Sequence, residues 1–265
     1  MQVLQCDQVG LEVRGHRLLQ GISFALDSGE VLGIAGRNGA GKSSLLRAVS
    51  GEARRMQGSV SLRGQPLHGV APRERARHLA MLPQSSSLQF DYRVRDIVAL
   101  GRIPHAARND ESVIDRVLDE CDLRDQAAQS YLTLSGGERQ RVQLARVLAQ
   151  LLPGAEEADL SGQLLLLDEP TNAMDIPHQE HFLALFSALR ARGCAILLVL
   201  HDLNLLARCA DRLLFLRDGE QLALGSTAEM LTEKRISELY DYPLCVWETP
   251  GGGTHISPQP HALAR

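Results

Sequence analysis

The sequence predicts an α/β fold, in which a core with a mostly parallel sheet carries an antiparallel β subdomain and an inserted α-helical subdomain. Three observations support this prediction. The apolar run "GEVLGIAG" leads through a glycine-rich turn into the helical pattern "GKSSLLRAVSG". The runs "QLLLLDEP" and "CAILLVLHD" are apolar without alternation, as are parallel strands covered on both faces. From residue 86 to residue 150 helical patterns occur without a strand-like apolar run.

The first part of the chain has the pattern of antiparallel strands. From Val3 to Leu26 the apolar residues come in short bursts, which "RGHR" and "QG" interrupt. Between the two apolar runs of the core, "HQEHFLALFSALRARG" has helical spacing and a glycine stop, so a helix is expected there.

The last part of the chain begins with a hairpin signal. Asp-Gly stands between two apolar runs in "RLLFLRDGEQLALG", which predicts two antiparallel strands joined by a tight turn. We expect "TAEMLTEKRISELY" to form one final helix. The stretch "PGGGTHISPQPHALAR" has the composition of a frayed tail.

Composition and charge exclude several classes of protein. The 265 residues allow one large domain or two joined ones, and the formal charge of -4 argues against a general nucleic-acid binder. The sequence has no apolar run long enough to span a bilayer, and its start lacks the pattern of an export signal, so we expect a cytoplasmic protein. No CxxC pair occurs, which predicts reduced thiols in Cys6, Cys121, Cys194, Cys209 and Cys245.

A phosphate-binding loop is predicted at "GRNGAGKSS", which fits GxxxxGK[ST] at every fixed position between a strand and a helix. Its glycines let backbone N–H groups face phosphate oxygens, and the alternative is a turn that merely starts a helix. Lys42 can reach the β- and γ-phosphates, and the Ser43 hydroxyl can bind Mg²⁺. The candidate nucleotide-binding residues are Gly36, Arg37, Asn38, Gly39, Ala40, Gly41, Lys42, Ser43 and Ser44.

Two carboxylates follow the four leucines of "QLLLLDEP". They would emerge at the carboxyl edge of the sheet, where such sheets bind ligands. Asp168 would hold Mg²⁺ directly or through water, and Glu169 would accept a proton from an attacking water. Taken alone, the pair could be surface charge at the end of a strand; together with Lys42 and Ser43 it indicates phosphoryl transfer.

A second anion site is predicted where "LSGGERQRVQLARVLAQ" begins a helix. Ser135, Gly136 and Gly137 would offer N–H groups and a hydroxyl at the positive end of the helix dipole. Glycine lets the backbone itself approach a phosphate, and it costs little at a helix end.

This motif set resembles the nucleotide-binding subunits of ATP-binding-cassette (ABC) transporters. "LSGGERQ" lies between a GxxxxGKS loop and "LLLLDEP", and the resemblance covers about Val3 to Tyr242. It implies a P-loop NTPase cassette with a RecA-like core (residues 1–85 and 151–242), a helical subdomain (86–150) and a C-terminal tail (243–265). It also implies a head-to-tail homodimer that sandwiches ATP and Mg²⁺. The residues implied to contact the nucleotide of the partner chain are Ser135, Gly136, Gly137 and Gln140.

Three further elements are similar to the family pattern. Gln84, in "LPQSS", resembles the glutamine that senses Mg²⁺ and the γ-phosphate, and His201, after "ILLVL", resembles the switch histidine. Taken singly, they could be a surface glutamine and a histidine at a strand end. "NAMD" resembles the D-loop, usually SALD, which places Asp175 at the dimer interface and leaves Asn172 and Met174 as departures.

The residue that stacks on adenine departs from the family. An aromatic side chain is usual shortly after the first strand, whereas the aligned position holds Val13. Arg14 or His16 could stack on the base instead, so weaker selectivity for adenine is a hypothesis.

The resemblance also implies the partners and the cargo. One cassette without a membrane span is typical of bacterial importers, in which the homodimer binds two copies of a permease at the cytoplasmic face of the inner membrane and a periplasmic protein delivers the cargo. "MLPQSSSLQFDYRVRDIVALGRIPHA" is similar to the branch that serves iron-siderophores, haem and vitamin B12, and the extension "LPGAEEADLSGQ" favours haem. Vitamin B12 or a ferric siderophore is the alternative cargo.

Other classes fit less well. A soluble ABC ATPase acting on DNA or ribosomes would carry a coiled coil or a second cassette, and a P-loop kinase would not explain "LSGGERQ". Direct haem ligation by His255 and His261 is disfavoured, because no apolar pocket is evident around them.

Overall fold

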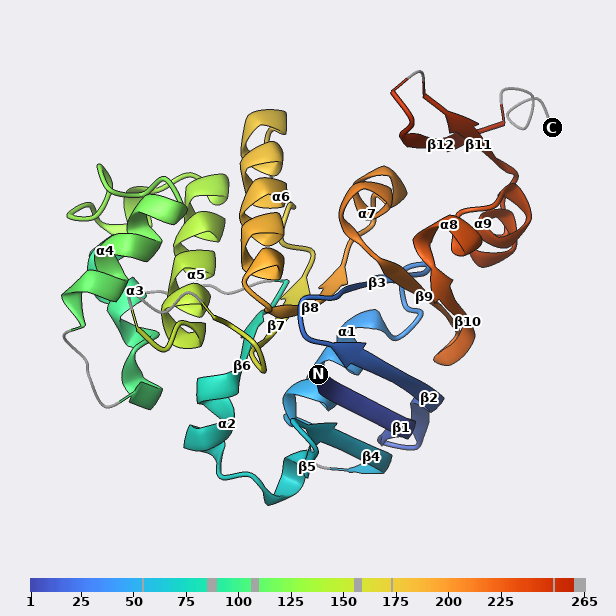
Figure 1. Cartoon of the computed structure of the whole chain (residues 1–265), viewed down its shortest axis with the longest axis horizontal. Helices are drawn as coiled ribbons and strands as arrows, with labels where there is room; N and C mark the ends of the chain where they lie inside the picture. The colour runs from blue at the N-terminus through green and yellow to red at the C-terminus, as the bar shows by residue number, and fades with distance from the viewer. Residues whose placement is uncertain are drawn as a thin grey trace.

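A long mixed sheet organises the molecule (Figure 1). The computed structural model describes residues 1–53, 55–84, 90–105, 110–154, 159–172, 174–249 and 251–259. In this part of the chain ten strands form one sheet, in the order β5-β4-β1-β2-β10-β9-β3-β8-β7-β6, and two more form a separate hairpin. The strands are β1 (Gln2–Val13), β2 (His16–Asp27), β3 (Val31–Ala35), β4 (Met56–Leu62), β5 (Gln65–Pro66), β6 (Leu79–Leu82), β7 (Leu164–Asp168), β8 (Ala195–Val199), β9 (Arg212–Arg217), β10 (Glu220–Ser226), β11 (Leu244–Glu248) and β12 (Thr254–Pro258).

The sheet has a parallel half and an antiparallel half. Strands β9, β3, β8, β7 and β6 pair in parallel, whereas β1 pairs antiparallel with both β2 and β4. The predicted fold class is therefore confirmed. The Asp-Gly hairpin is confirmed as β9 and β10, with Asp218 and Gly219 both in the left-handed region, as a tight hairpin turn requires.

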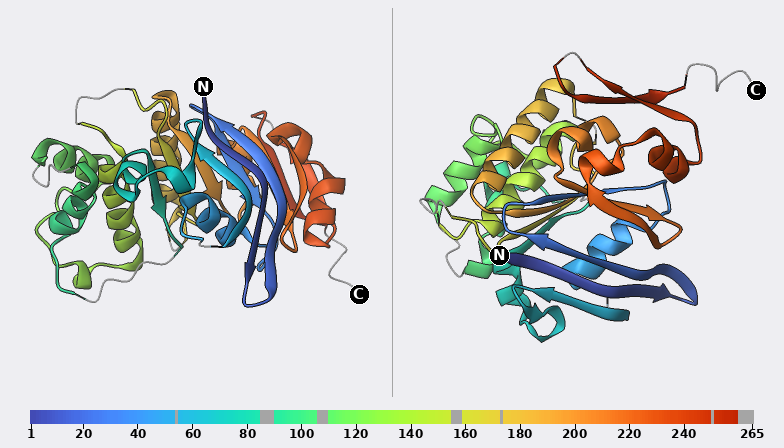
Figure 2. Two further views of the ribbon diagram at one scale, coloured as in Figure 1. Left: turned by 90° about the horizontal axis from the view of Figure 1, so that it is seen from below. Right: turned by 45° about the vertical axis from the view of Figure 1, so that its right-hand side comes forward.

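The described part of the chain has helices on both faces of the parallel half and at one end of the molecule (Figure 1). They are α1 (Lys42–Ser50), α2 (Pro72–His78), α3 (Val94–Leu100), α4 (Glu111–Glu120), α5 (Gly136–Leu151), α6 (Ile176–Ala191), α7 (Leu203–Cys209), α8 (Thr227–Met230) and α9 (Glu233–Tyr240). Figures 1 and 2 show α3, α4 and α5 together at one end of the molecule, and β11 and β12 near the other. No strand occurs among the described residues from 90 to 150.

Burial on both faces explains why apolar and polar residues do not alternate along the central strands. Leu164 and Leu166 of β7 belong to the core that α1 shares with β1 and β2, whereas Leu165 and Leu167 belong to the core beneath α5 and α6. Each of these four side chains is fully buried. The strand is therefore fixed between two packed layers, and the charged residues at its carboxyl end are held in a defined position.

A buried arginine fixes the C-terminal end of α5. Arg102 is 1% exposed, and its Nη1 donates to the carbonyl of Ala149 at 2.8 Å. It also donates to the carbonyls of Leu152 and Pro153, and its Nη2 lies 3.0 Å from Oδ2 of Asp110. A cation at this end of a helix satisfies carbonyl groups that have no partner within the helix and complements the helix dipole.

Two expectations for the C-terminal part were wrong. The single helix expected over "TAEMLTEKRISELY" is two helices, because Thr232 is extended (φ -106°, ψ 148°) and starts α9 anew. The tail expected to fray contains strand β12 instead, which pairs antiparallel with β11. Ile256 of β12 is buried against α7, where the amide of Asn204 accepts from its N–H at 2.7 Å and donates to its carbonyl at 3.2 Å.

Candidate nucleotide-binding site

The loop from residue 36 to 41 joins β3 to α1 and has a backbone that few residues can adopt. A Cβ on Gly36 would lie 2.3 Å from the carbonyl oxygen of Leu216, and Gly41 has a φ of 102°. Both positions therefore require glycine. No side chain caps α1 at Gly41, so the first backbone N–H groups of this helix are left for an anion, which the positive end of the helix favours.

The side chain of Lys42 folds back against the loop that precedes it. Its side chain is buried, and Nζ donates to the carbonyls of Gly36 at 2.8 Å and Arg37 at 2.9 Å. Burial lowers the pKa of the ammonium group, and the charges of Glu169 and Asp168 partly offset this effect. A positive charge thus stands between the loop and two carboxylates.

A cavity of about 620 Å³ opens in front of this loop. It is large enough for a triphosphate and lies at the carboxyl edge of the parallel strands, where such sheets bind ligands. Its lining residues are Arg17, Leu18, Asn38, Gly39, Gly41, Lys42, Ser43, Ser44, Gln84, Glu169, His201, Asp218 and Gly219.

Asp168 ends β7 beside Ser43 and has the features of a cation ligand. Burial raises the pKa of its carboxyl group, while a hydrogen bond with the Ser43 side chain and the charge of Lys42 act against this rise. Its Oδ1 is buried and has no hydrogen-bond partner among the described residues. A buried carboxylate oxygen without a partner, next to a hydroxyl group, fits a hard divalent cation such as Mg²⁺.

Glu169 is held by three neighbours. Its Oε2 accepts from Nε2 of Gln84 and from Nδ2 of Asn172, each at 2.8 Å, and its Oε1 pairs with Nε2 of His201. Glu169 is 6% exposed and has a φ of 51°, in a region that non-glycine residues rarely adopt. Backbone strain of this kind clusters at functional sites, and here it aims a carboxylate into the cavity.

The glycine pair lies at a second cavity, of about 410 Å³. Ser135 caps α5, because its Oγ accepts from the N–H of Glu138 while the Glu138 carboxylate accepts from the N–H of Ser135. A Cβ on Gly136 would meet no described atom within 4 Å outside its own helix and chain neighbours, so the packing of this chain does not require glycine there. The second cavity is lined by Ser135, Gly136, Gly137, Glu138, Arg141, Met174, Asp175 and His178.

The two cavities of the described chain have no lining residue in common. The predicted residues Lys42, Asp168 and Glu169 belong together, whereas Ser135 and its neighbours form a separate surface. Gln140, predicted to act with Ser135, does not line the second cavity, but its Nε2 is buried without a partner in the described part of the chain.

The chain is similar to known proteins. The family profile described as ABC transporter matches residues 19–172, which is more than half of the chain. The chain is 46% identical to the hemin import ATP-binding protein HmuV of Pseudomonas fluorescens over 95% of this chain and 97% of that protein. It is 44% identical to HmuV of Myxococcus xanthus over 96% of this chain and 98% of that protein.

The chain belongs to the ABC transporter family. It is an ATP-binding subunit and an ATPase of that family. A solved inward-facing ABC transporter assigned to the metal-chelate type superposes with a TM-score of 0.79 at 26% identity, over 99% of this chain and 100% of the compared chain. In the described part of this ABC subunit, no helix is both long and apolar enough to cross a membrane.

The segment predicted as the D-loop leads into α6 of this ABC subunit. Asp175 caps that helix, as its Oδ1 accepts from the N–H of His178 at 3.2 Å and also pairs with the His178 ring. Ala173, within "NAMD", lies outside the described residues, as do residues 85–89 after Gln84, residues 155–158 of the extension, and His261. His255 lies on β12.

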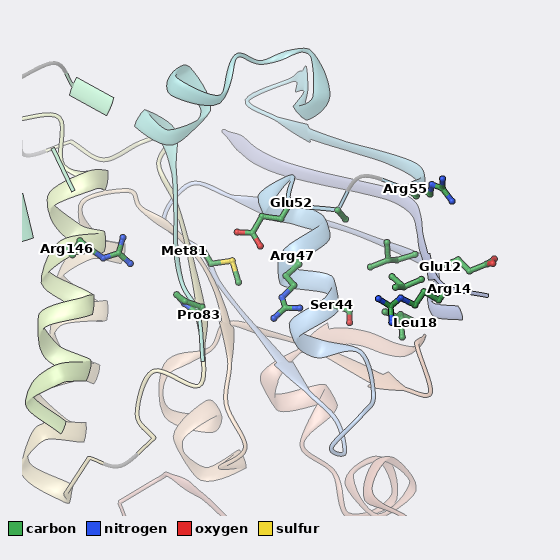
Figure 3. A pocket seen from close by; sticks show the side chains of 13 residues that line it. Glu12, Arg14, Leu18, Ser44, Arg47, Glu52, Arg55, Met81, Pro83 and Arg146 are labelled. Atoms are coloured by element: carbon green, nitrogen blue, oxygen red, sulfur yellow. The ribbon is translucent and has the colours of Figure 1, made fainter. Parts of the chain in front are cut away.

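A larger groove, of about 920 Å³, runs across α1 of this ABC subunit (Figure 3). Val13 and Arg14 line one end of it beside Ser44, whereas His16 lines neither this groove nor the phosphate cavity. Figure 3 shows the labelled side chains from the β1–β2 end to α5: Glu12, Arg55, Arg14, Leu18, Ser44, Arg47, Glu52, Met81, Pro83 and Arg146.

Several lining residues were missed by the sequence analysis. The turn at Asp218 and Gly219 borders the phosphate cavity, and the N–H of Gly219 donates to the carbonyl of Ala40 at 3.1 Å. The Asp-Gly signal predicted the hairpin correctly. The position of this turn beside the cavity depends on the pairing of Glu220 with Gln20, which no local sequence pattern reveals. Arg17 was also missed.

Proposed function

We propose that this ABC subunit hydrolyses ATP to drive import of haem through a separate permease. The observation that carries the proposal is similarity at 42–46% identity to proteins named for hemin import, over nearly their whole length. The structural neighbour of the metal-chelate type is consistent with this cargo class. Vitamin B12 or a ferric siderophore remains the alternative cargo.

The phosphate cavity would hold ATP with Mg²⁺. The loop from residue 36 to 44 would bind the phosphates, and Lys42 would turn from its carbonyl partners to the β- and γ-phosphates. Ser43, Asp168 and Gln84 would hold Mg²⁺, which supplies positive charge to the phosphates when bound. Glu169 would accept a proton from the attacking water, and His201 would orient Glu169 and bind the γ-phosphate.

Two copies of the chain would complete each site. The phosphate loop borders one side of the cavity, and phosphoryl transfer needs positive charge on all sides of the γ-phosphate. The surface at Ser135, Gly136, Gly137 and Gln140 would supply it from the second copy, with Asp175 at the interface. From the resemblance to the ABC family we also propose that residues 1–242 form the cassette and that residues 243–265 form a C-terminal segment.

The groove across α1 would receive a short helix of the permease. Pro83 and Met81 line it just before Gln84, so a permease helix seated there would lie next to a residue that contacts Glu169. ATP can drive closure only by binding the closed dimer more tightly, and closure would then rock the membrane subunits. The subunit would be peripheral, on the cytoplasmic face of the inner membrane.

Recognition of the base would rest on non-aromatic groups. Val13 is 45% exposed, and Arg14 lies beside it at the end of the groove nearest Ser44. A guanidinium can stack on any base, which predicts weak discrimination between ATP and GTP. Comparable kcat/KM values for the two nucleotides would support this arrangement, and a strong preference for ATP would oppose it.

Transport by the reconstituted complex tests the proposal. The subunit and its permease, in liposomes with ATP on the subunit's side, should take up haem from the loaded periplasmic binding protein. A Glu169→Gln complex is the matched control. Uptake of vitamin B12 or a ferric siderophore in place of haem would correct the cargo, whereas cosedimentation with ribosomes and not with permease-containing membranes would refute a transport role.

A further inference from the structure

We propose that Asn172 is a positioning residue for hydrolysis, which fixes the carboxylate of Glu169 through a donor on the same turn. The inference rests on the proposed function, because it takes Glu169 as the group that receives the proton. The observation that carries it is the 2.8 Å contact between Nδ2 of Asn172 and Oε2 of Glu169.

Two hydrogen bonds close the turn that joins these two residues, one from the backbone and one from the side chain of Asn172. The N–H of Asn172 donates to the backbone carbonyl of Glu169 at 3.2 Å, and the side chain of Asn172 then returns to the carboxylate of the same residue. Pro170, between them, has a fixed φ. The N–H of Glu169 is in turn bound to the carbonyl of Val199 on β8 at 3.0 Å. The distance between the Asn172 amide and the carboxylate is thus set by local geometry.

The other two partners of Glu169 come from neighbouring strands. Gln84 follows β6 and His201 follows β8, the strands that flank β7. Their contacts depend on how separate strand ends and the loops after them are placed. Only the Asn172 donor moves with Glu169 itself, so it can hold the carboxylate while the surrounding segments change position during the transport cycle.

The chemistry requires a donor at this place. In hydrolysis the water oxygen bonds to the γ-phosphorus, the bond from that phosphorus to the bridging oxygen of ADP breaks, and Glu169 takes the water proton. A carboxylate has about four acceptor positions, of which three are occupied here, leaving one for the water. An amide N–H that donates to Oε2 fixes the rotation of the carboxylate.

The environment would strengthen this contact in the assembled dimer. Glu169 is buried, whereas Asn172 is exposed in the single chain. Asn172 stands three residues before Asp175, on the face that we propose to meet the second copy. Exclusion of water from that face would leave the carboxylate as the main acceptor for the amide.

ATPase kinetics of the assembled transporter test the inference. Asn172→Ala removes the donor, and Asn172→Asp keeps the shape but replaces the donor with a charge of the same sign as Glu169. Gln179→Ala is the matched control, because the Gln179 amide lies on the adjoining helix and binds the carbonyl of Met174 instead of Glu169.

We expect Asn172→Ala to lower kcat about 10-fold, the effect of a hydrogen bond to a charged group, with KM changed less than about twofold. Asn172→Asp should have a kcat at least as low as that of Asn172→Ala. If Asn172 acted only through packing, Asn172→Asp would instead retain the original kcat. Gln179→Ala should retain the original kcat. In a Glu169→Gln background, Asn172→Ala should cause no further loss, because the two residues act as one unit.

The inference would be overturned by an unchanged kcat in Asn172→Ala, by a restored kcat in Asn172→Asp, or by an equal loss in Gln179→Ala. A full additional loss in the Glu169→Gln background would do so as well. If the unmodified transporter hydrolyses no ATP, the failure lies with the proposed function instead.

Discussion

Nε2 of Gln84 lies 2.8 Å from Oε2 of Glu169, so the residue that follows β6 is bonded to the carboxylate that follows β7. The two strands pair in parallel, with Leu82 opposite Leu167, and this register brings their carboxyl ends together. Pro83, next to Gln84, lines the groove that we propose for the permease. A movement in that groove therefore has a direct route to the carboxylate that we propose for hydrolysis.

Replacing Glu169 tests its role in proton transfer. Glu169→Gln keeps the size of the side chain but removes its basicity, so turnover should fall on the order of 10²–10⁴-fold, the usual contribution of a general base. ATP binding should persist, because Lys42 and the phosphate loop are unchanged. Steady-state ATPase assays and calorimetry with ATP check both points, and turnover equal to that of the unmodified protein would refute the assignment.

The glycine pair can be tested without disturbing the fold. Gly136→Ala adds a methyl group that meets no described atom of its surroundings, so the melting temperature should be retained or raised. ATP-dependent dimerisation, followed by light scattering in a Glu169→Gln background, should nevertheless weaken, and Ser135→Arg should abolish it. Monomer nucleotide affinity should stay unchanged in both variants; loss of that affinity would show that this helix serves its own chain.

Asp168 should make the nucleotide-free protein less stable at neutral pH. Burial raises its pKa in the folded state above the value of 3.8, so the folded protein binds more protons than the unfolded chain in the interval between the two pKa values. Stability is therefore lost as the pH rises through that interval. Asp168→Asn removes this penalty and should raise the melting temperature by roughly 2–4 °C, as expected for about 1 kcal/mol in a chain of this size.

Thermal unfolding at pH 5 and pH 8 without Mg²⁺ measures this effect. The gain in Asp168→Asn should be larger at pH 8, while Mg²⁺-dependent nucleotide binding should be lost. If Asp168→Asn melted at a lower temperature than the unmodified protein at pH 8, the ionised carboxylate would stabilise the fold, against this account.

Arg102 should matter for stability and not for chemistry. Arg102→Met fills much of the same space but leaves Asp110 and the carbonyls at the end of α5 without their cation. Breaking a buried ion pair in this way costs about 3–5 kcal/mol. Urea unfolding should show this loss, and Arg116→Met, at a partly exposed ion pair with Glu120, serves as the milder control. Equal losses in the two variants would contradict a special role for the buried site.

The features that could be predicted from the sequence are those that local chemistry determines. The phosphate loop needs glycine at Gly36 and Gly41 and a strand and helix around it, and all of these are contiguous in the chain. The partner of Glu169 on its own turn was not foreseen, because the departure at Asn172 has no meaning until the turn is folded. Ile256 was assigned to a frayed tail, since glycine and proline surround it; its burial depends on α7, which lies far away in the sequence.

Complementation between two inactive variants tests the shared site most directly. Lys42→Ala destroys the phosphate loop of a chain, and Ser135→Arg destroys the surface that the chain offers to its partner. In a head-to-tail dimer, a mixed pair keeps one complete site, so an equal mixture should regain up to about a quarter of the original ATPase activity, since half of randomly paired dimers are mixed. If the mixture stays as inactive as its components, or if Ser135→Arg alone is fully active, two chains do not share the site.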